Sequence, residues 1–273
     1  MPGLHSRRLG RTGLMVAELG LGAMDTPESP EGPATLTTAL ALGIDFVDTA
    51  REYAGSEFLI GQVVRTRGGA DFHIASKTFS HTLDGSQRDV DRSLSILGVD
   101  SVALYQLHDI STPEAWDRAM REDDGALAGL RIAQYRGLVR YIGMSSHSLD
   151  VLRLAIESGQ FDTVMLEYSA FFPQTAPLIE LAAAHDVGVI VMRPLGGSGR
   201  TSELRGRIAA GYAGLLTPAN LLRYVLSHPG VSVAIPGARH PSRIIENVAT
   251  AADYAPLDAD ERRALEAATA ELA

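Results

Sequence analysis

The sequence predicts an α/β fold, a single (β/α)8 TIM barrel spanning residues 1–273, and three observations support this prediction. Eight short apolar runs alternate with longer amphipathic segments along the chain. Several of these runs are nearly continuous in Val, Ile and Leu, a pattern typical of parallel strands that are buried on both faces. The length of 273 residues fits one such barrel, which commonly has about 250 residues.

The eight expected strands share this apolar composition. They cover residues 17–22, 46–49, 73–77, 101–107, 141–145, 163–167, 187–192 and 233–236. Strands that alternate with helices and are joined by right-handed crossovers close naturally into a barrel. An open doubly wound sheet is the alternative, but residues 20–24 lack the third glycine of the dinucleotide-binding turn expected after its first strand.

The expected helices lie between these runs, and a β-hairpin precedes the first strand. The helices cover residues 35–42, 56–64, 89–97, 127–135, 149–158, 177–185, 218–226 and 242–251, and a C-terminal helix covers 258–272. Ser56 is a candidate N-cap, and Gly43 and Gly159 are candidate C-caps. The segments 7–9 and 14–16 flank Gly10-Arg11-Thr12-Gly13, which predicts a hairpin that could plug the N-terminal mouth of the barrel.

Composition excludes several classes of function. The chain has no cysteine, which rules out disulfides, thiolate metal sites and cysteine nucleophiles. Its formal net charge of −9 argues against a nucleic-acid partner. No run reaches the ~18 consecutive apolar residues of a membrane-spanning helix, and no signal-peptide core follows the N-terminus. We therefore expect a cytoplasmic protein without a membrane partner, either a monomer or a small homo-oligomer.

Four titratable residues follow the second, third and fourth predicted strands. Asp48 ends the second strand and Tyr53 comes shortly after it, Lys77 ends the third strand, and His108 follows the fourth. The C-terminal ends of barrel strands meet at one mouth, which is where barrel active sites lie. The four side chains are therefore expected to converge at that mouth.

This set of side chains suits proton transfer to a carbonyl oxygen while a hydride arrives at the carbon. A phenol has an ordinary pKa of about 10, and a neighbouring ammonium is expected to lower it. We therefore predict that Tyr53 is the general acid, that Lys77 tunes its pKa and that Asp48 anchors Lys77. His108 would orient the substrate oxygen or share the proton. The lone Trp116, after the fourth strand, is a candidate for the substrate wall, with local packing as the alternative.

The order and spacing of these residues resemble the aldo-keto reductase superfamily. The resemblance covers about residues 6–252 and rests on the segments 45–53, 55–57, 76–78, 107–108, 137–145 and 235–238, with Arg243, Glu246 and Asn247. It implies a (β/α)8 barrel that binds NADPH without a Rossmann domain or a metal. It also implies reduction of a small-molecule aldehyde or ketone by the tetrad of Asp48, Tyr53, Lys77 and His108.

The resemblance implies a set of cofactor-binding residues as well. Arg243 matches the arginine that holds the adenosine 2′-phosphate, but Gly237 stands where many members carry a lysine for the same phosphate, so NADH use stays open beside NADPH. The segment 194–199 matches the loop that covers the pyrophosphate. The full expected set is Gly22, Ala23, Met24, Asp48, Ser145, Ser146, Met165, Met192, Arg193, Pro194, Leu195, Gly197, Ser198, Gly237, Ala238, Arg243, Glu246 and Asn247.

Three residues depart from the family pattern where the nicotinamide is expected. Ser146 replaces a common asparagine, Met165 replaces a common glutamine, and Met192 replaces an aromatic residue that stacks on the ring. These departures leave two alternatives open. One is a cofactor-binding regulatory or partner subunit, and the other is a non-redox lyase or isomerase on the same barrel.

Overall fold

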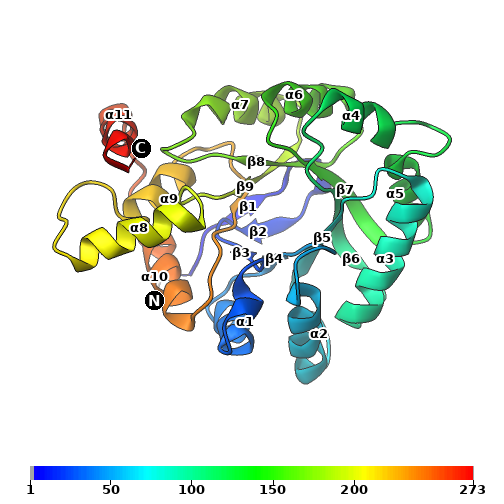
Figure 1. Cartoon of the computed structure of the whole chain (residues 1–273), viewed down its shortest axis with the longest axis horizontal. Helices are drawn as coiled ribbons and strands as arrows, with labels where there is room; N and C mark the ends of the chain where they lie inside the picture. Colours follow the sequence, from blue (N-terminus) through cyan, green and yellow to red (C-terminus); the bar gives the residue numbers. More distant parts are fainter. Residues whose placement is uncertain (1–2, 273) are drawn as a thin grey trace.

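The computed structural model describes residues 3–272, and within them eight parallel strands form a ring surrounded by helices (Figure 1). The sheet order is β10-β9-β8-β7-β6-β5-β4-β3, and parallel bridges from Leu19 to Ala234 and from Gly22 to Gly237 join its two edges. This closure confirms the predicted (β/α)8 barrel. The strands are β3 Leu21–Gly22, β4 Phe46–Asp48, β5 His73–Thr78, β6 Val102–Leu107, β7 Val139–Ser145, β8 Thr163–Glu167, β9 Gly188–Met192 and β10 Val233–Ala234.

The first predicted strand, residues 17–22, is divided in the structure. Ala17 ends β2 (Met15–Ala17), which belongs to the N-terminal hairpin, and only Leu21–Gly22 form the barrel strand β3. Residues 17–21 are all buried, so the burial pattern of the sequence does not show where the chain passes from the hairpin to the barrel strand. The last strand, predicted over residues 233–236, ends at Ala234.

Helices cover the outside of the barrel (Figure 1). They are α1 Gly32–Ala41, α2 Ser56–Arg67, α3 Leu83–Leu97, α4 Pro113–Ala119, α5 Ala126–Tyr135, α6 Leu149–Ser158, α7 Ala176–Ala184, α8 Ser198–Ala209, α9 Pro218–Leu226, α10 Pro241–Ala252 and α11 Ala259–Ala268. A 3₁₀ turn, Thr269–Leu272, continues the predicted C-terminal helix. Within residues 3–272, no helix has the length and apolarity needed to cross a membrane.

Three helices differ from the prediction for identifiable reasons. The third begins at Leu83 instead of residue 89, because the Thr82 side chain accepts a hydrogen bond from the Gly85 N–H and caps the helix. Helix α4 was not predicted, and it spans only 113–119. Helix α8 was not predicted either, because it buries only Leu204 and so lacks an apolar period.

The predicted hairpin seals the N-terminal end of the barrel. Strand β1 (Ser6–Arg8) pairs antiparallel with β2, and a 3₁₀ turn over Gly10–Thr12 joins them. Its apolar side chains pack inside the barrel against those of the strands; the cluster includes Leu9, Leu14, Val16, Phe46, Leu104 and Ile190. The interior is therefore filled at this end, and the C-terminal ends of the strands form the open mouth.

Arg7 of β1 connects the hairpin to segments near the other end of the chain. Its guanidinium donates to the carbonyl oxygens of Leu226 at 2.6 Å, His228 at 3.0 Å and Val231 at 2.9 Å. It also pairs with the buried carboxylate of Glu18 at 2.6 Å. These contacts join the first strand to α9 and to the segment that leads into β10.

The hairpin turn depends on Gly10. Its φ is +51°, and a Cβ added there would lie 2.1 Å from the backbone nitrogen of Gly188. Gly13 also has a positive φ, +69°, but a Cβ there meets nothing within 4 Å, so Gly13→Ala is a control for backbone strain alone. We expect Gly10→Ala to lower the free energy of unfolding by about 2 kcal/mol more than Gly13→Ala, because overpacking costs roughly 1–3 kcal/mol. Urea unfolding measures both; equal losses would contradict the close contact.

Candidate active site

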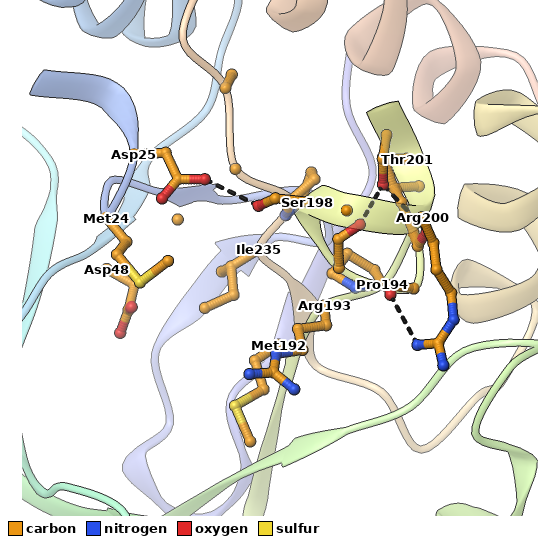
Figure 2. A pocket seen from close by; sticks show the side chains of 18 of the residues that line it. Met24, Asp25, Asp48, Met192, Arg193, Pro194, Ser198, Arg200, Thr201 and Ile235 are labelled. Atoms are coloured by element: carbon orange, nitrogen blue, oxygen red, sulfur yellow. Dashed lines mark hydrogen bonds between the residues drawn. The ribbon is translucent and has the colours of Figure 1, made fainter. Parts of the chain in front are cut away.

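A cavity of about 890 Å³ opens at the C-terminal mouth of the barrel. Its wall is built by residues at the ends of β3, β4, β7 and β9, by Met165 within β8 and by the segments that follow several strands. This volume lies within the roughly 300–1,000 Å³ of typical ligand sites. Figure 2 shows Met24 and Asp48 on one side of the cavity, with Met192, Arg193 and α8 opposite.

The four predicted tetrad residues meet at this cavity. Lys77 Nζ donates to Asp48 Oδ2 at 2.6 Å and to the carbonyl of Thr49 at 2.8 Å. It also lies 3.5 Å from Tyr53 Oη, and Tyr53 Oη lies 3.3 Å from His108 Nε2. Asp48, Tyr53 and His108 line the cavity, whereas Lys77 is completely buried. One hydroxyl group thus faces an ammonium, an imidazole and the open cavity.

The loop that carries Tyr53 is fixed at both ends. The backbone N–H of Ser56 donates to the Tyr53 carbonyl at 3.0 Å where α2 begins. Arg51 forms an ion pair with the buried carboxylate of Glu57 on α2, and the hydroxyl of Ser76 on β5 donates to the same carboxylate at 2.7 Å. The loop is therefore tied to both α2 and β5, which holds the Tyr53 hydroxyl close to Lys77.

Burial dominates the electrostatics of the tetrad. It raises the pKa of Asp48 and lowers the pKa of Lys77, and the ion pair between the two opposes both shifts. Burial also raises the pKa of Tyr53 well above its ordinary value, and the carboxylates of Asp48 and Glu52 raise it further. The net shift of the Tyr53 pKa is therefore upward, opposite to the direction expected from the neighbouring ammonium. Because burial and these carboxylates set the direction of the shift, Tyr53 stays protonated at neutral pH.

Most of the residues expected to bind a cofactor line the cavity. They are Gly22, Met24, Asp48, Ser145, Met165, Met192, Arg193, Pro194, Leu195, Gly197, Ser198, Gly237, Ala238, Arg243 and Asn247. Three expected residues are not on its wall. Ala23 and Ser146 are completely buried, and the Ser146 hydroxyl accepts the N–H of Ser148 at the start of α6. The carboxylate of Glu246 pairs with Arg205 and Arg243.

Trp116 lies away from the cavity. It belongs to α4, and its ring packs against Phe161 with 6.2 Å between the ring centroids. Because it is not among the residues that line the cavity, the structure favours local packing, the alternative considered for this residue, over a place in the substrate wall.

Three arginines on the cavity wall were not anticipated from the sequence. Arg200 and Arg205 belong to α8, and Arg239 precedes α10. The signal for two of them was the recurrence of arginine just after the glycine-rich segment 196–199. The sequence predicts a loop there and no helix after it, because α8 has only Leu204 buried and therefore lacks an apolar period.

This arginine-rich part of the cavity suits a phosphorylated ligand. Arg200, Arg205 and Arg243 all line it, and α8 begins there with no acidic residue in its first turn and no side chain of the described residues capping it. The free N–H groups and the dipole of a helix N-terminus favour anions. A Cβ added to Gly199 would meet nothing within 4 Å, so space remains beside these donors. The donor set therefore fits the phosphates of a dinucleotide.

A hydrogen bond bridges the cavity from α8 to the segment after β3 (Figure 2). The Ser198 hydroxyl donates to Asp25 Oδ2 at 2.9 Å, and the guanidinium of Arg239 lies 3.6 Å from the same oxygen. These contacts connect α8, the loop after β3 and the loop before α10 around the arginine-rich part of the cavity.

The barrel, the tetrad at its mouth and the arginine-rich part of the cavity together define a class, the barrel oxidoreductases. The model of the aldo/keto reductase family matches residues 18–214. The chain belongs to the aldo/keto reductase family, which confirms the resemblance seen in the sequence.

Similar proteins cover nearly the whole chain. The uncharacterized oxidoreductase YqkF of Bacillus subtilis is 24% identical over 97% of this chain and 97% of its own. L-Galactose dehydrogenase of Arabidopsis thaliana is 28% identical over 96% and 92%. The structure of PA4992 from Pseudomonas aeruginosa has a TM-score of 0.75 at 29% identity, over 92% and 97%. The aldo-keto reductase AKR11C1 from Bacillus halodurans has a TM-score of 0.80 at 23% identity, over 97% and 96%, and supports the fold.

Proposed function

We propose that the protein reduces an aldehyde, ketone or sugar carbonyl with NADPH, and that Tyr53 is the general acid. The observation that carries this proposal is the position of the Tyr53 hydroxyl. It lies 3.5 Å from Lys77 Nζ and 3.3 Å from His108 Nε2 and faces the cavity. A protonated phenol placed beside two nitrogen groups is suited to give one proton to a substrate oxygen.

The residues of the chain account for the proton side of the reaction. Bound NADPH would supply the hydride that adds to the carbonyl carbon. The carbonyl oxygen would accept a hydrogen bond from Tyr53 Oη, with His108 beside it, and would take the Tyr53 proton as negative charge develops on it. Lys77 would then stabilise the phenolate that remains, and Asp48 holds Lys77 at 2.6 Å for that role. A positioned general acid of this kind contributes roughly 10²–10⁴-fold to the rate.

Several features support NADPH as the cofactor. Arg205 and Arg243 approach the two oxygens of the Glu246 carboxylate at 2.8 and 2.7 Å, which places two guanidinium groups close together on the wall of the cavity. The thioethers of Met165 and Met192 line the cavity as well, and thioethers pack well against rings. An aldo-keto reductase from Klebsiella pneumoniae, solved in complex with NADPH, shares the fold at a TM-score of 0.76 and 22% identity.

The first test is turnover. Oxidation of NADPH with a panel of aldehydes, ketones and sugars is expected to show steady-state reduction of at least one compound. Because one relative is an L-galactose dehydrogenase, the panel includes L-galactose, which is tested with the oxidised cofactors. Cofactor binding without any turnover would favour a binding subunit, and product formation without cofactor would favour a lyase or isomerase.

Arg243→Ala tests the assignment of the 2′-phosphate. Losing one charge-assisted hydrogen bond costs about 1.5–3 kcal/mol, so we expect NADPH binding to weaken about tenfold or more and NADH binding to change little. Titration followed by nicotinamide fluorescence measures both. Arg153→Ala is the control, because Arg153 on α6 also faces a glutamate along its own helix but lies outside the cavity. Equal losses for the two cofactors would contradict the assignment.

A further inference from the structure

The imidazole of His108 is enclosed by a different group on each side. Its Nε2 lies 3.3 Å from Tyr53 Oη, and its ring stacks on Phe79 with 4.0 Å between centroids and an angle of 15°. Its Nδ1 is buried, makes no hydrogen bond within normal geometry to residues 3–272, and lies 3.5 Å from Glu52 Oε2. Glu52 therefore presents a carboxylate to the ring nitrogen that faces away from Tyr53.

The carboxylate of Glu52 is held in this position. The backbone N–H of Phe79 donates to Glu52 Oε1 at 3.3 Å, which leaves Oε2 on the side of His108. Burial acts to raise the pKa of Glu52, but the contact with His108 and the hydrogen bond from the Phe79 backbone outweigh it and lower the pKa. The group facing Nδ1 is therefore an ionised acceptor at neutral pH.

We propose that Glu52 is a positioning residue that fixes the proton of His108 on Nδ1 and thereby prepares Nε2 to exchange a proton with the oxygen of Tyr53. The kinetic consequence of this contact rests on the proposed carbonyl reduction, whereas the contact itself does not. The sequence does not predict a role for Glu52. It lies in the loop after β4, and its contact with His108 joins residues that are far apart in the sequence.

The proton balance follows from this arrangement. In the reduction, Tyr53 gives its proton to the substrate oxygen, and the imidazolium form of His108 then returns one from Nε2 to the Tyr53 oxygen. His108 is left neutral, with its remaining proton on Nδ1 facing Glu52, and takes a new proton on Nε2 from solvent in the cavity. Glu52 keeps its charge throughout and stabilises the imidazolium form.

The charged groups that influence the pKa of His108 lie on β4, in the loop that follows β4, and on β5. Burial is the largest influence and lowers the pKa of His108. Glu52, after β4, and Asp48, at the end of β4, raise the pKa, whereas Lys77 on β5 lowers it. Removing the charge of Glu52 is therefore expected to lower the pKa of His108 further, because the ammonium of Lys77 then meets less opposition.

A ¹⁵N NMR titration of the histidine side chains tests the contact without any substrate. The His108→Ala spectrum identifies the His108 signal among those of the eight histidines. We expect the Nδ1–H tautomer in the neutral wild-type ring, and in Glu52→Gln a His108 pKa lower by about one unit, as for loss of an opposite charge nearby. Glu122→Gln removes an exposed carboxylate outside the cavity and should change nothing. An unchanged pKa in Glu52→Gln, or the Nε2–H tautomer in wild type, would overturn the proposal.

The pH profile of carbonyl reduction tests the consequence. The proposed proton return uses the imidazolium form, so kcat/KM is expected to fall as pH rises through the pKa of His108. In Glu52→Gln the fall is expected to begin about one pH unit lower. Above both pKa values the variant would then be about tenfold slower, and Glu52→Asp, which keeps the charge but reaches less far, should lie between. An NMR shift without this kinetic shift would overturn the proton-exchange role. Absence of all turnover in wild type would instead count against the proposed function, and the NMR result would still decide the contact.

Discussion

Tyr53→Phe is expected to bind NADPH as well as the wild-type protein and to lose nearly all turnover. The substitution keeps the ring, which lies edge-on to His108 with 5.4 Å between the centroids and has Lys77 Nζ 4.7 Å from its centroid. It removes only the hydroxyl, and a general acid of this kind is worth roughly 10²–10⁴-fold in rate. Steady-state kinetics with the best substrate of the panel, together with a fluorescence titration of NADPH, measures both quantities.

Tyr135→Phe is the matched control for this experiment. Tyr135 on α5 is 95% exposed, so removing its hydroxyl changes neither the cavity nor the core. A Tyr53→Phe enzyme that kept rates close to those of the control would show that another group supplies the proton, and the proposed role of Tyr53 would have to be abandoned.

Lys77→Met is expected to reduce both activity and stability. Lys77 is completely buried, and its ammonium donates to Asp48 and to the Thr49 carbonyl. Methionine fills similar space but leaves the Asp48 carboxylate buried without a cation. Removing one partner of a buried ion pair costs about 3–5 kcal/mol of unfolding free energy. Urea denaturation followed by circular dichroism measures the loss, and kcat reports the missing stabilisation of the phenolate.

The double variant Asp48→Asn/Lys77→Met separates these effects. Replacing the carboxylate by an amide removes the unpaired charge, so the double variant should be more stable than Lys77→Met alone while remaining inactive. If the double variant is no more stable than the single one, the loss does not arise from an unpaired carboxylate, and poor packing of the methionine would be its source.

The barrel and the tetrad were predictable because their signals are local in the sequence. Strands buried on both faces give continuous apolar runs, and the residues directly after such runs fall at one mouth. Asp48, Lys77 and His108 were found in this way, and Tyr53 follows within the same loop. These side chains meet because the strands that carry them, β4, β5 and β6, are neighbours in the sheet. Their order in the sequence was enough to predict this.

The rest depends on contacts between distant parts of the chain. The direction of the Tyr53 pKa shift is set by burial and by the carboxylate of Asp48, which also forms an ion pair with Lys77. Neither the burial of Tyr53 nor this ion pair can be seen in the sequence. Helix α8 has almost no buried face, so its arginines could not be assigned to the cavity. The packing of Trp116 against Phe161 depends on how α4 is placed relative to the segment after α6.

The contacts that join the start of the chain to its C-terminal part have a consequence for biosynthesis. Its acceptor on Leu226 lies 219 residues further along the chain, and the partner of Leu19 in the closing strand is Ala234. A nascent chain on the ribosome therefore carries β3 as an open sheet edge until β10 has been translated, and open edges pair readily with other strands. Chains arrested before that point are expected to aggregate or to engage chaperones, so that completion of translation, more than any local signal, releases the barrel as a closed unit.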